Sequence, residues 1–267
     1  MAEYKIIFSD IDGTLLTSKH EVSEKTKEAL KKLKKVNIPF VLVSARMPKG
    51  IYKVQKEIDY DSPIVCYSGG LVIDNLGRSI LSNGINLDIA YEVKKYIDSN
   101  WKEVSTSCYS DNQWIVDDKE NEWIVQESEI TSVEPVVGNI LDACSNNQVI
   151  HKILCMGNPE MIDEIKKSIY QKFTGLSIYK SKETYLEIMA DTATKSNAMK
   201  VLCDMLNVNI NETIAIGDNY NDVDMIVTAG KGIAMGNAPK EVKEKSDYVT
   251  LSNDEDGVSA VIEKYFD

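Results

Sequence analysis

Residues 8–16, with the sequence FSDIDGTLL, decide how the chain is interpreted. They continue an apolar run, YKIIF, whose composition predicts a buried β-strand ending close to Asp10. If the backbone stays extended beyond that end, side chains alternate, and Asp10 and Asp12 point the same way. Two carboxylates held close together repel each other unless a cation lies beside them. The alternative is an ordinary polar turn, since Asp and Gly are common turn residues.

Predicted strands and helices alternate at both ends of the chain. The first part predicts strands at residues 4–9, 39–44 and 63–67, helices at 23–36 and 48–58, and a hairpin turning at 74–77. The last part predicts helices at 195–207, 222–229 and 257–266, a further helix beginning near Pro239, and strands at 213–216, 232–235 and 248–251. Such alternation predicts a parallel sheet with crossover helices.

The middle of the chain has a different order of elements. It predicts a helix at 87–99, strands at 103–109 and 113–117, a less certain stretch at 121–148, a strand at 151–156, a helix at 159–173, and strands at 176–180 and 184–189. This order is α+β in character. We therefore predict an α/β fold with two domains. Residues 1–82 and 191–267 form a Rossmann-like parallel-sheet core, and residues 83–190 form an inserted α+β cap.

Composition excludes several classes of protein. The 267 residues carry a formal net charge of −12, which argues against nucleic acid or an anionic membrane as the main partner. A small anionic substrate is still compatible, because local charge and a bound metal can override the global field. No apolar run approaches the length of a membrane span, and the start MAEYKIIFSD lacks the features of a signal peptide. We expect a cytoplasmic protein.

The cysteines and histidines do not form a recognisable metal or disulfide pattern. The five cysteines are scattered, no Cys-x-x-Cys occurs, and the two histidines are His20 and His151. A structural zinc site or a disulfide framework is therefore not expected, and the thiols should be buried and reduced. We interpret both histidines as structural or exposed rather than as substrate contacts.

Polar side chains gather where the predicted strands end. The set comprises Asp10, Asp12, Ser44, Asp218 and Asp222, together with Lys195 at the start of a helix entering the same region. The carboxyl ends of parallel strands meet at one edge of a sheet, where ligands bind. We therefore expect these side chains to form one site.

The chemistry of this set indicates phosphoryl transfer. Four aspartates together require a cation, and oxygen ligands without Cys or His favour Mg²⁺ over Zn²⁺. The hydroxyl of Ser44 and the ammonium of Lys195 suit phosphate oxygens. One carboxylate can act as the nucleophile and form an aspartyl-phosphate. A second, two residues on, can serve as general acid and then as general base.

Four segments resemble the motifs of the haloacid dehalogenase superfamily, in the order found there. They are DIDGTLL, VSAR, TKSNAMKVL and IGDNYNDVDMI. The C-terminal run GIAMGNAPKEVKEKSDYVTLSNDEDGVSAVIEKYF resembles the Cof-type branch, which has a large type IIB cap. The resemblance covers nearly all of the core, whereas the cap agrees mainly in position and length.

The resemblance implies a role for each residue of the set. Asp10 is the expected nucleophile and Asp12 the expected acid/base, a pair typical of phosphatases and phosphomutases. The transport ATPases of the superfamily have Thr in place of Asp12, and its dehalogenases lack this acid. Ser44 and Lys195 are expected to bind the phosphate, and Asn221 to order the phosphate or the motif. The expected Mg²⁺ ligands are Asp10, the backbone carbonyl of Asp12 and Asp218, with Asp222 binding directly or through water.

Three segments depart from the family pattern. The family usually has Asn-Gly-Ala where this chain has Ser68-Gly69-Gly70, Lys-Gly where it has Lys195-Ser196, and often Thr-Gly-Arg where it has Ser44-Ala45-Arg46. Serine keeps the hydroxyl of threonine, so the Ser44 motif is retained. The loss of Asn at position 68 puts in question any substrate contact that it would make.

Together the residues and the resemblance predict a Mg²⁺-dependent phosphatase. Its substrates would be small phosphomonoesters such as sugar phosphates or phosphorylated cofactors, cleaved through an aspartyl-phosphate. The alternatives are a phosphomutase using the same site, or a non-catalytic phosphosugar-binding regulatory protein. A receiver-type signalling domain is disfavoured, because it needs a long-lived phosphoaspartate without a built-in hydrolytic base. The sequence leaves the oligomeric state open, as it does the cap residues that set specificity.

Overall fold

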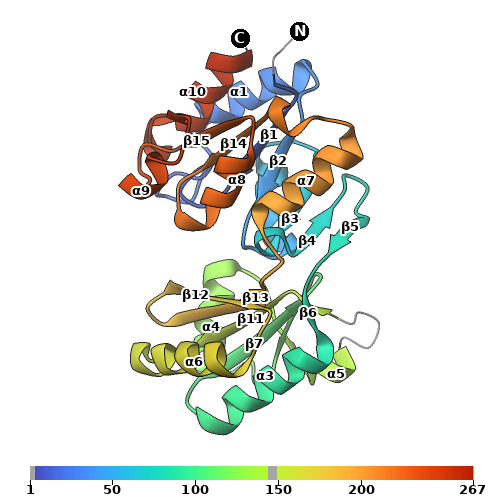
Figure 1. The fold of residues 1–267 in the computed structure, drawn as a ribbon, viewed down its shortest axis with the longest axis vertical. Helices are drawn as coiled ribbons and strands as arrows, with labels where there is room; N and C mark the ends of the chain where they lie inside the picture. Colours follow the sequence, from blue (N-terminus) through green and yellow to red (C-terminus); the bar gives the residue numbers. More distant parts are fainter. Residues whose placement is uncertain (1–3, 144–148, 267) are drawn as a thin grey trace. The chain divides into compact units, whose positions relative to one another are not determined.

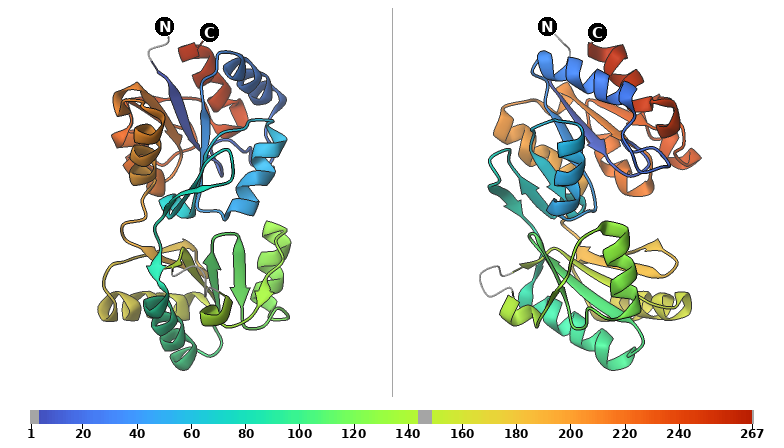
Figure 2. Two further views of the ribbon diagram at one scale, coloured as in Figure 1. Left: turned by 90° about the vertical axis from the view of Figure 1, so that its right-hand side faces the viewer. Right: turned by 180° about the vertical axis from the view of Figure 1, so that it is seen from behind.

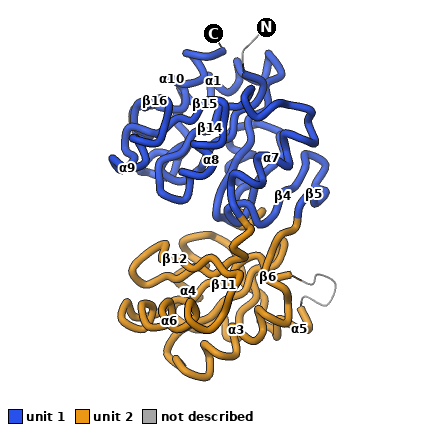
Figure 3. The backbone as a smooth tube through the Cα atoms, viewed as in Figure 1, with its two compact units in different colours: residues 1–46, 51–81, 194–267 blue, residues 47–50, 82–193 orange. Residues whose placement is uncertain are grey.

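The computed structural model describes residues 4–143 and 149–266, which form two compact units (Figures 1 and 3). The first comprises the described residues of 1–46, 51–81 and 194–267, and the second those of 47–50 and 82–193. The chain passes between them after Arg46, Gly50, Leu81 and Ala193. The sequence had placed the domain boundaries after residue 82 and before residue 191.

The first unit is built on an eight-stranded sheet with the order β16-β15-β14-β1-β2-β3-β4-β5. The strands from β16 to β3 pair in parallel, as predicted, whereas β4 is antiparallel to β3. Their bounds are β1 Ile6–Asp10, β2 Phe40–Val43, β3 Ile64–Cys66, β4 Leu71–Ile73, β5 Ser79–Ser82, β14 Thr213–Gly217, β15 Lys231–Ala234 and β16 Tyr248–Val249. β1 and β14 are neighbours at the centre of the sheet.

Helices cover both faces of this sheet. α7 and α8 lie on one face and α1 and α10 on the other, as the view along the sheet in Figure 2 shows. The helical bounds are α1 Glu24–Lys35, α2 Pro48–Glu57, η1 Tyr67–Gly69, α7 Lys195–Leu206, η2 Ile210–Glu212, η3 Tyr220–Asp222, α8 Val223–Thr228, α9 Lys240–Lys243, η4 Asn253–Glu255 and α10 Gly257–Phe266. Of the η segments, η2, η3 and η4 are single 3₁₀ turns, whereas η1 consists of residues with positive φ.

Apolar strand residues and one face of α7 make the core that fixes the centre of the sheet. Phe8, Val41, Met199 and Leu202 are fully or almost fully buried in one cluster. Burying a side chain of this size contributes roughly 1.5–3 kcal/mol. This packing places the first residue of α7, Lys195, beside the ends of β1 and β14.

The second unit has a six-stranded sheet with the order β12-β13-β11-β7-β8-β9 and a separate pair, β10-β6. Residues such as Ile153 and Leu186 pack in the same apolar cluster as Val93 of α3 and Ile165 of α6. The bounds are β6 Ile85–Asn86, α3 Leu87–Asn100, β7 Ser105–Ser110, β8 Gln113–Val116, α4 Glu122–Thr131, β9 Val136–Val137, α5 Ile140–Ala143, β10 Val149–Ile150, β11 Lys152–Met156, α6 Pro159–Lys172, β12 Leu176–Lys182 and β13 Tyr185–Ala190.

The uncertain stretch of the sequence, residues 121–148, therefore contains α4, β9 and α5, while residues 144–148 lie outside the described part. Within the described part, no helix combines the length and the apolar character needed to cross a membrane. The described cysteines are buried, as expected, and none of them forms a disulfide: Cys66, Cys108, Cys155 and Cys203. Cys144 lies outside the described residues.

Candidate active site

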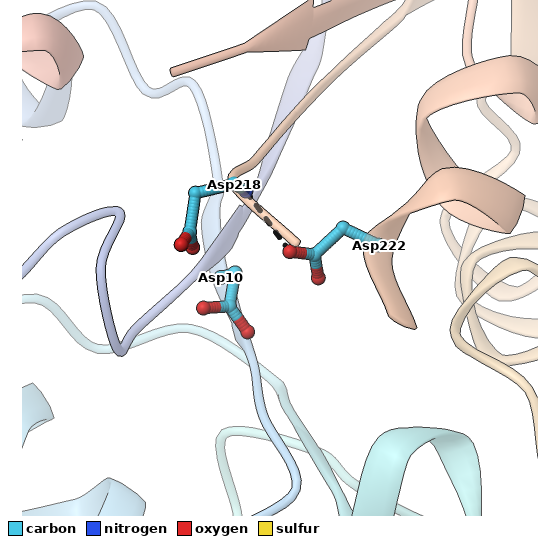
Figure 4. Close-up of side chains that lie close together, drawn as sticks. All are labelled: Asp10, Asp218 and Asp222. Carbon is cyan, nitrogen blue, oxygen red and sulfur yellow. Dashed lines mark hydrogen bonds between the residues drawn. The ribbon is translucent and has the colours of Figure 1, made fainter. Parts of the chain in front are cut away.

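Three aspartates meet at the carboxyl ends of β1 and β14 (Figure 4). Asp10 is the last residue of β1, Asp218 directly follows β14, and Asp222 closes η3. One carboxylate oxygen of each lies within 4.8 Å of the others. The sheet extends from β1 through β2 on one side and through β14 on the other, and ligands bind at such switch points in open α/β sheets.

Lys195 links two of these carboxylates. Its Nζ donates hydrogen bonds of 2.5 Å to Oδ1 of Asp10 and of 2.5 Å to Oδ1 of Asp222. Thr194 caps the helix by accepting a bond from the N–H of Asn197 at 3.1 Å, so α7 begins at Lys195. The lysine side chain is fully buried, and its charge is therefore directed into the site rather than into solvent.

The loops after β1 and β14 are fixed by contacts to the same aspartates. Asp222 Oδ2 accepts the N–H groups of Asp218 (3.0 Å) and Asn219 (2.9 Å), and Thr14 Oγ1 donates to Asp218 Oδ1 at 2.8 Å. Gly13 has a φ of +80°, and a Cβ there would lie 2.4 Å from Asp218 Oδ2. Only glycine allows this approach without displacing the carboxylate.

The carboxylates outnumber the cations in the site. Burial raises the pKa of Asp10 well above its usual value; the charges of Asp222 and Asp218 add to this and Lys195 opposes it. Burial likewise raises the pKa of Asp218 to about 6. Burial alone would lower the pKa of Lys195, but Asp10 and Asp222 outweigh it and raise the value. A crowded set of oxygen donors with a deficit of positive charge fits a hard divalent cation.

Asp12 is not part of this cluster of three, which corrects the expectation that four aspartates meet within metal-ligand distance of one another. Its half-exposed carboxylate binds the guanidinium of Arg46 instead. The physical reason is local. β1 ends at Asp10, and the carbonyl oxygen of Ile11 accepts bonds from Leu15 (3.0 Å) and Leu16 (2.9 Å). The chain turns there, so the alternation of an extended strand no longer applies.

The predicted phosphate-binding residues have different surroundings. Lys195 lies among the aspartates, as described above. Ser44 is buried at the end of β2, where its Oγ accepts the N–H of Arg46 at 3.2 Å. Asn221 is exposed, and its side chain forms no hydrogen bond within the part of the chain that the structure describes. The structure thus places Lys195 among the clustered aspartates, whereas Asn221 is exposed on the surface of the protein.

Several supporting residues were missed in the sequence. Thr14 and Arg46 lie inside the quoted motifs, and this position could have marked them as site residues. Their hydrogen-bond partners could not be predicted from the sequence. Asp224 Oδ2 accepts the N–H of Ser196 at 2.8 Å, and both residues likewise lie inside the quoted motifs.

The departing segment Ser68-Gly69-Gly70 lies in a tight loop. Tyr67 and Ser68 have a φ of 51°, and Gly69 has a φ of +105°. A Cβ at Gly69 would lie 2.1 Å from the carbonyl oxygen of Thr194. The Ser68 hydroxyl is buried and has no hydrogen-bond partner among the described residues.

Comparison with known proteins agrees with this geometry. Residues 7–262 match the family of haloacid dehalogenase-like hydrolases. A putative phosphatase of Haemophilus influenzae is 37% identical over 98% of both chains. A crystal structure of a haloacid dehalogenase-like hydrolase from Bacteroides thetaiotaomicron superimposes with a TM-score of 0.89 at 29% identity, covering 98% of this chain and 100% of that one.

A structure described as a HAD subclass IIB sugar phosphatase shares the fold of both units, with a TM-score of 0.78 at 23% identity, covering 98% of each chain. The sequence motifs, the fold and these matches agree. The chain therefore belongs to the haloacid dehalogenase-like hydrolases, in the Cof-type branch.

Proposed function

We propose that the protein is a Mg²⁺-dependent phosphatase that hydrolyses small phosphomonoesters through an aspartyl-phosphate on Asp10. The observation that carries this proposal is the placement of Asp10. Its carboxylate ends the central strand and is bonded to the buried ammonium of Lys195. It also lies within reach of two further carboxylates, Asp218 and Asp222. The names of the relatives, which include putative phosphatases, support the same activity.

In the first step an oxygen of Asp10 attacks the phosphorus of the ester, opposite the leaving oxygen. The bond between phosphorus and the ester oxygen breaks as Asp12 gives a proton to the departing alcohol. The products of this step are the alcohol and a phosphoryl group on Asp10. Lys195 and Ser44 neutralise and orient the phosphate oxygens, which places the phosphorus for in-line attack.

In the second step Asp12 takes a proton from a water molecule, whose oxygen attacks the phosphorus. The bond to Asp10 breaks, inorganic phosphate leaves, and the free carboxylate is restored. The two aspartates therefore have separate tasks. The buried Asp10 makes and loses the covalent bond, and the half-exposed Asp12 moves the proton in both directions.

The proposed metal ligands include the three clustered carboxylates. Asp10, Asp218 and the backbone carbonyl of Asp12 would be ligands, with Asp222 acting directly or through water. When bound, Mg²⁺ supplies the positive charge that lets a carboxylate approach an anionic phosphate. Unit 2, which holds residues 83–190, would serve as the cap domain that excludes bulk water and selects a small substrate such as a sugar phosphate or a phosphorylated cofactor.

The test is phosphate release from a panel of phosphomonoesters, with Mg²⁺ and with a chelator. Wild type would be compared with Asp10→Asn and with Asp59→Asn, a matched control at an exposed aspartate on the same unit. The proposal predicts metal-dependent release in wild type and in Asp59→Asn, and no turnover in Asp10→Asn. Comparable release by Asp10→Asn would refute it. Transfer of phosphate between positions of a hexose phosphate, without release, would instead identify a phosphomutase.

A further inference from the structure

Arg46 belongs to the segment that follows β2, and its backbone is fixed from two sides. Its N–H donates to Ser44 Oγ at 3.2 Å, and its carbonyl oxygen accepts the N–H of Tyr67 at 3.2 Å. Ser68, the next residue, donates its N–H to the carbonyl oxygen of Ser44 at 2.9 Å. Tyr67 and Ser68 both occupy the left-handed region, where non-glycine residues persist only when their surroundings hold them. The Arg46 side chain therefore extends from a firmly placed loop.

The guanidinium of Arg46 holds both oxygens of the Asp12 carboxylate. Nε donates to Oδ2 at 2.9 Å, and one terminal nitrogen donates to Oδ1 at 2.6 Å. Two parallel bonds of this kind fix the orientation of a carboxylate as well as its distance. Among the residues that the structure describes, no other side chain bonds to this carboxylate. Arg46 therefore determines where the Asp12 carboxylate points.

We propose that Arg46 is a positioning residue for Asp12 in both proton transfers, an inference that rests on the proposed function. Asp12 must bring one oxygen to hydrogen-bond distance of the leaving oxygen, and later of the attacking water. Without Arg46 its side chain would sample several rotamers, and each transfer would wait for the right one. Such positioning affects the rate of the chemical step rather than the affinity for substrate. Arg46 itself makes and breaks no covalent bond.

The test uses two aryl esters with leaving groups of different basicity, 4-nitrophenyl phosphate and phenyl phosphate. Phenolate is the more basic leaving group and needs the proton more. In Arg46→Met we expect kcat/KM, which reports formation of the aspartyl-phosphate, to fall about tenfold further for phenyl phosphate than for 4-nitrophenyl phosphate, with kcat lowered for both esters. Arg46→Lys keeps the positive charge but cannot donate two parallel hydrogen bonds to the carboxylate, so it should recover only part of kcat.

A double-mutant cycle separates this role from substrate binding. In the Asp12→Asn background, Arg46→Met should change kcat by less than about twofold, because the group that Arg46 positions has gone. A rise in KM with kcat retained, an equal loss of kcat/KM for both esters, or the same loss of kcat with and without Asp12 would each overturn the proposal. Arg46 is partly exposed, so thermal unfolding of the variant should match wild type and exclude misfolding.

A readout independent of turnover distinguishes failure of this inference from failure of the proposed function. If wild type cleaves neither ester nor any other phosphomonoester, the proposed function fails. The inference is then judged from crystal structures of wild type and Arg46→Met. The proposal predicts one orientation of the Asp12 carboxylate in wild type and a changed or multiple orientation in the variant. The same single orientation in both would refute it.

Discussion

At the residue scale, the site depends on how closely the loops after β1 and β14 approach each other. Gly13 allows the backbone of the first loop to lie against the Asp218 carboxylate, and Thr14 donates a hydrogen bond to it. The positive φ of Gly13 alone does not explain its place, because Gly77 in the β4–β5 turn has nearly the same φ, +78°, with open space around it. Comparing the two glycines therefore distinguishes the effect of a positive φ from the effect of close contact with the Asp218 carboxylate.

This pair predicts different outcomes for the same substitution. Gly13→Ala would place a methyl group 2.4 Å from Asp218 Oδ2, so the carboxylate must move and metal-dependent activity should fall by about a hundredfold or more. Gly77→Ala should cost only about 1–2 kcal/mol of stability, from the left-handed backbone, with kcat and KM unchanged. Steady-state kinetics and urea unfolding of both variants measure these effects. Equal kinetic loss in the two variants would contradict the account.

The sequence allowed part of the site to be predicted, for a physical reason. Asp10, Asp218 and Asp222 follow apolar runs that become neighbouring parallel strands, and the end of a parallel strand is where ligands bind. The partner of Asp12 could not be predicted, because it depends on how the chain turns after Ile11 and where the loop after β2 lies. These are properties of tertiary packing rather than of local residue types.

At the element scale, long periodic segments were predictable and short loops were not. The final helix was predicted at 257–266 and is found as α10 Gly257–Phe266, because its apolar face repeats at helical spacing. The left-handed residues of η1 could not be predicted, since bonds from distant backbone atoms of Ser44 and Arg46 hold them there. The short α5 and β9 lie in the stretch whose pattern was ambiguous.

His151 is buried between Ser82, the first residue after Leu81 that belongs to the second unit, and the turn between β7 and β8. Its Nε2 lies 3.1 Å from Ser82 Oγ at the end of β5, and its Nδ1 accepts the N–H of Asp111, between β7 and β8, at 3.1 Å. Burial lowers the pKa of His151 from 6.5 to about 4, with the charge of Asp111 opposing this. The structure therefore agrees with the structural role expected for this histidine and excludes solvent from it.

This shift predicts a loss of stability in acid. Between pH 6.5 and about 4 the unfolded chain binds a proton at His151 that the folded chain does not, so unfolding is favoured as the pH falls. Between pH 7.5 and 5 the loss should be about 2 kcal/mol. Urea unfolding at both pH values measures it. His151→Asn should lose this part of the pH dependence, and His20→Asn, at the exposed histidine, should keep it. An unchanged pH dependence in His151→Asn would contradict the assignment.

At the scale of the whole molecule, the candidate site and the apolar core of the second unit belong to separately packed parts of the chain. The protein carries a net charge of −12, and its site gathers three carboxylates around one lysine. A divalent cation that binds only the folded first unit stabilises that unit by mass action, by about 2.7 kcal/mol at a hundred times its dissociation constant.

Metal binding should therefore protect one unit selectively. With Mg²⁺ added, amide hydrogen exchange should slow in β1 and β14, while β11 and β13 of the second unit exchange as before. Asp218→Asn removes one carboxylate of the cluster and should abolish the protection without unfolding the chain. Equal protection of both units, or protection that persists in Asp218→Asn, would show that the cation acts elsewhere.

The central claim is that Asp10 carries the phosphoryl group during turnover. The most direct measurement is a rapid acid quench of wild type mixed with Mg²⁺ and a substrate from the phosphate-release panel, followed by peptide mass spectrometry. The account predicts a transient gain of one phosphoryl group on the peptide that contains residues 8–16, lost in Asp10→Asn and retained in Asp59→Asn. Substrate turnover with no phosphorylated enzyme at any quench time, or with the group on another residue, would contradict it.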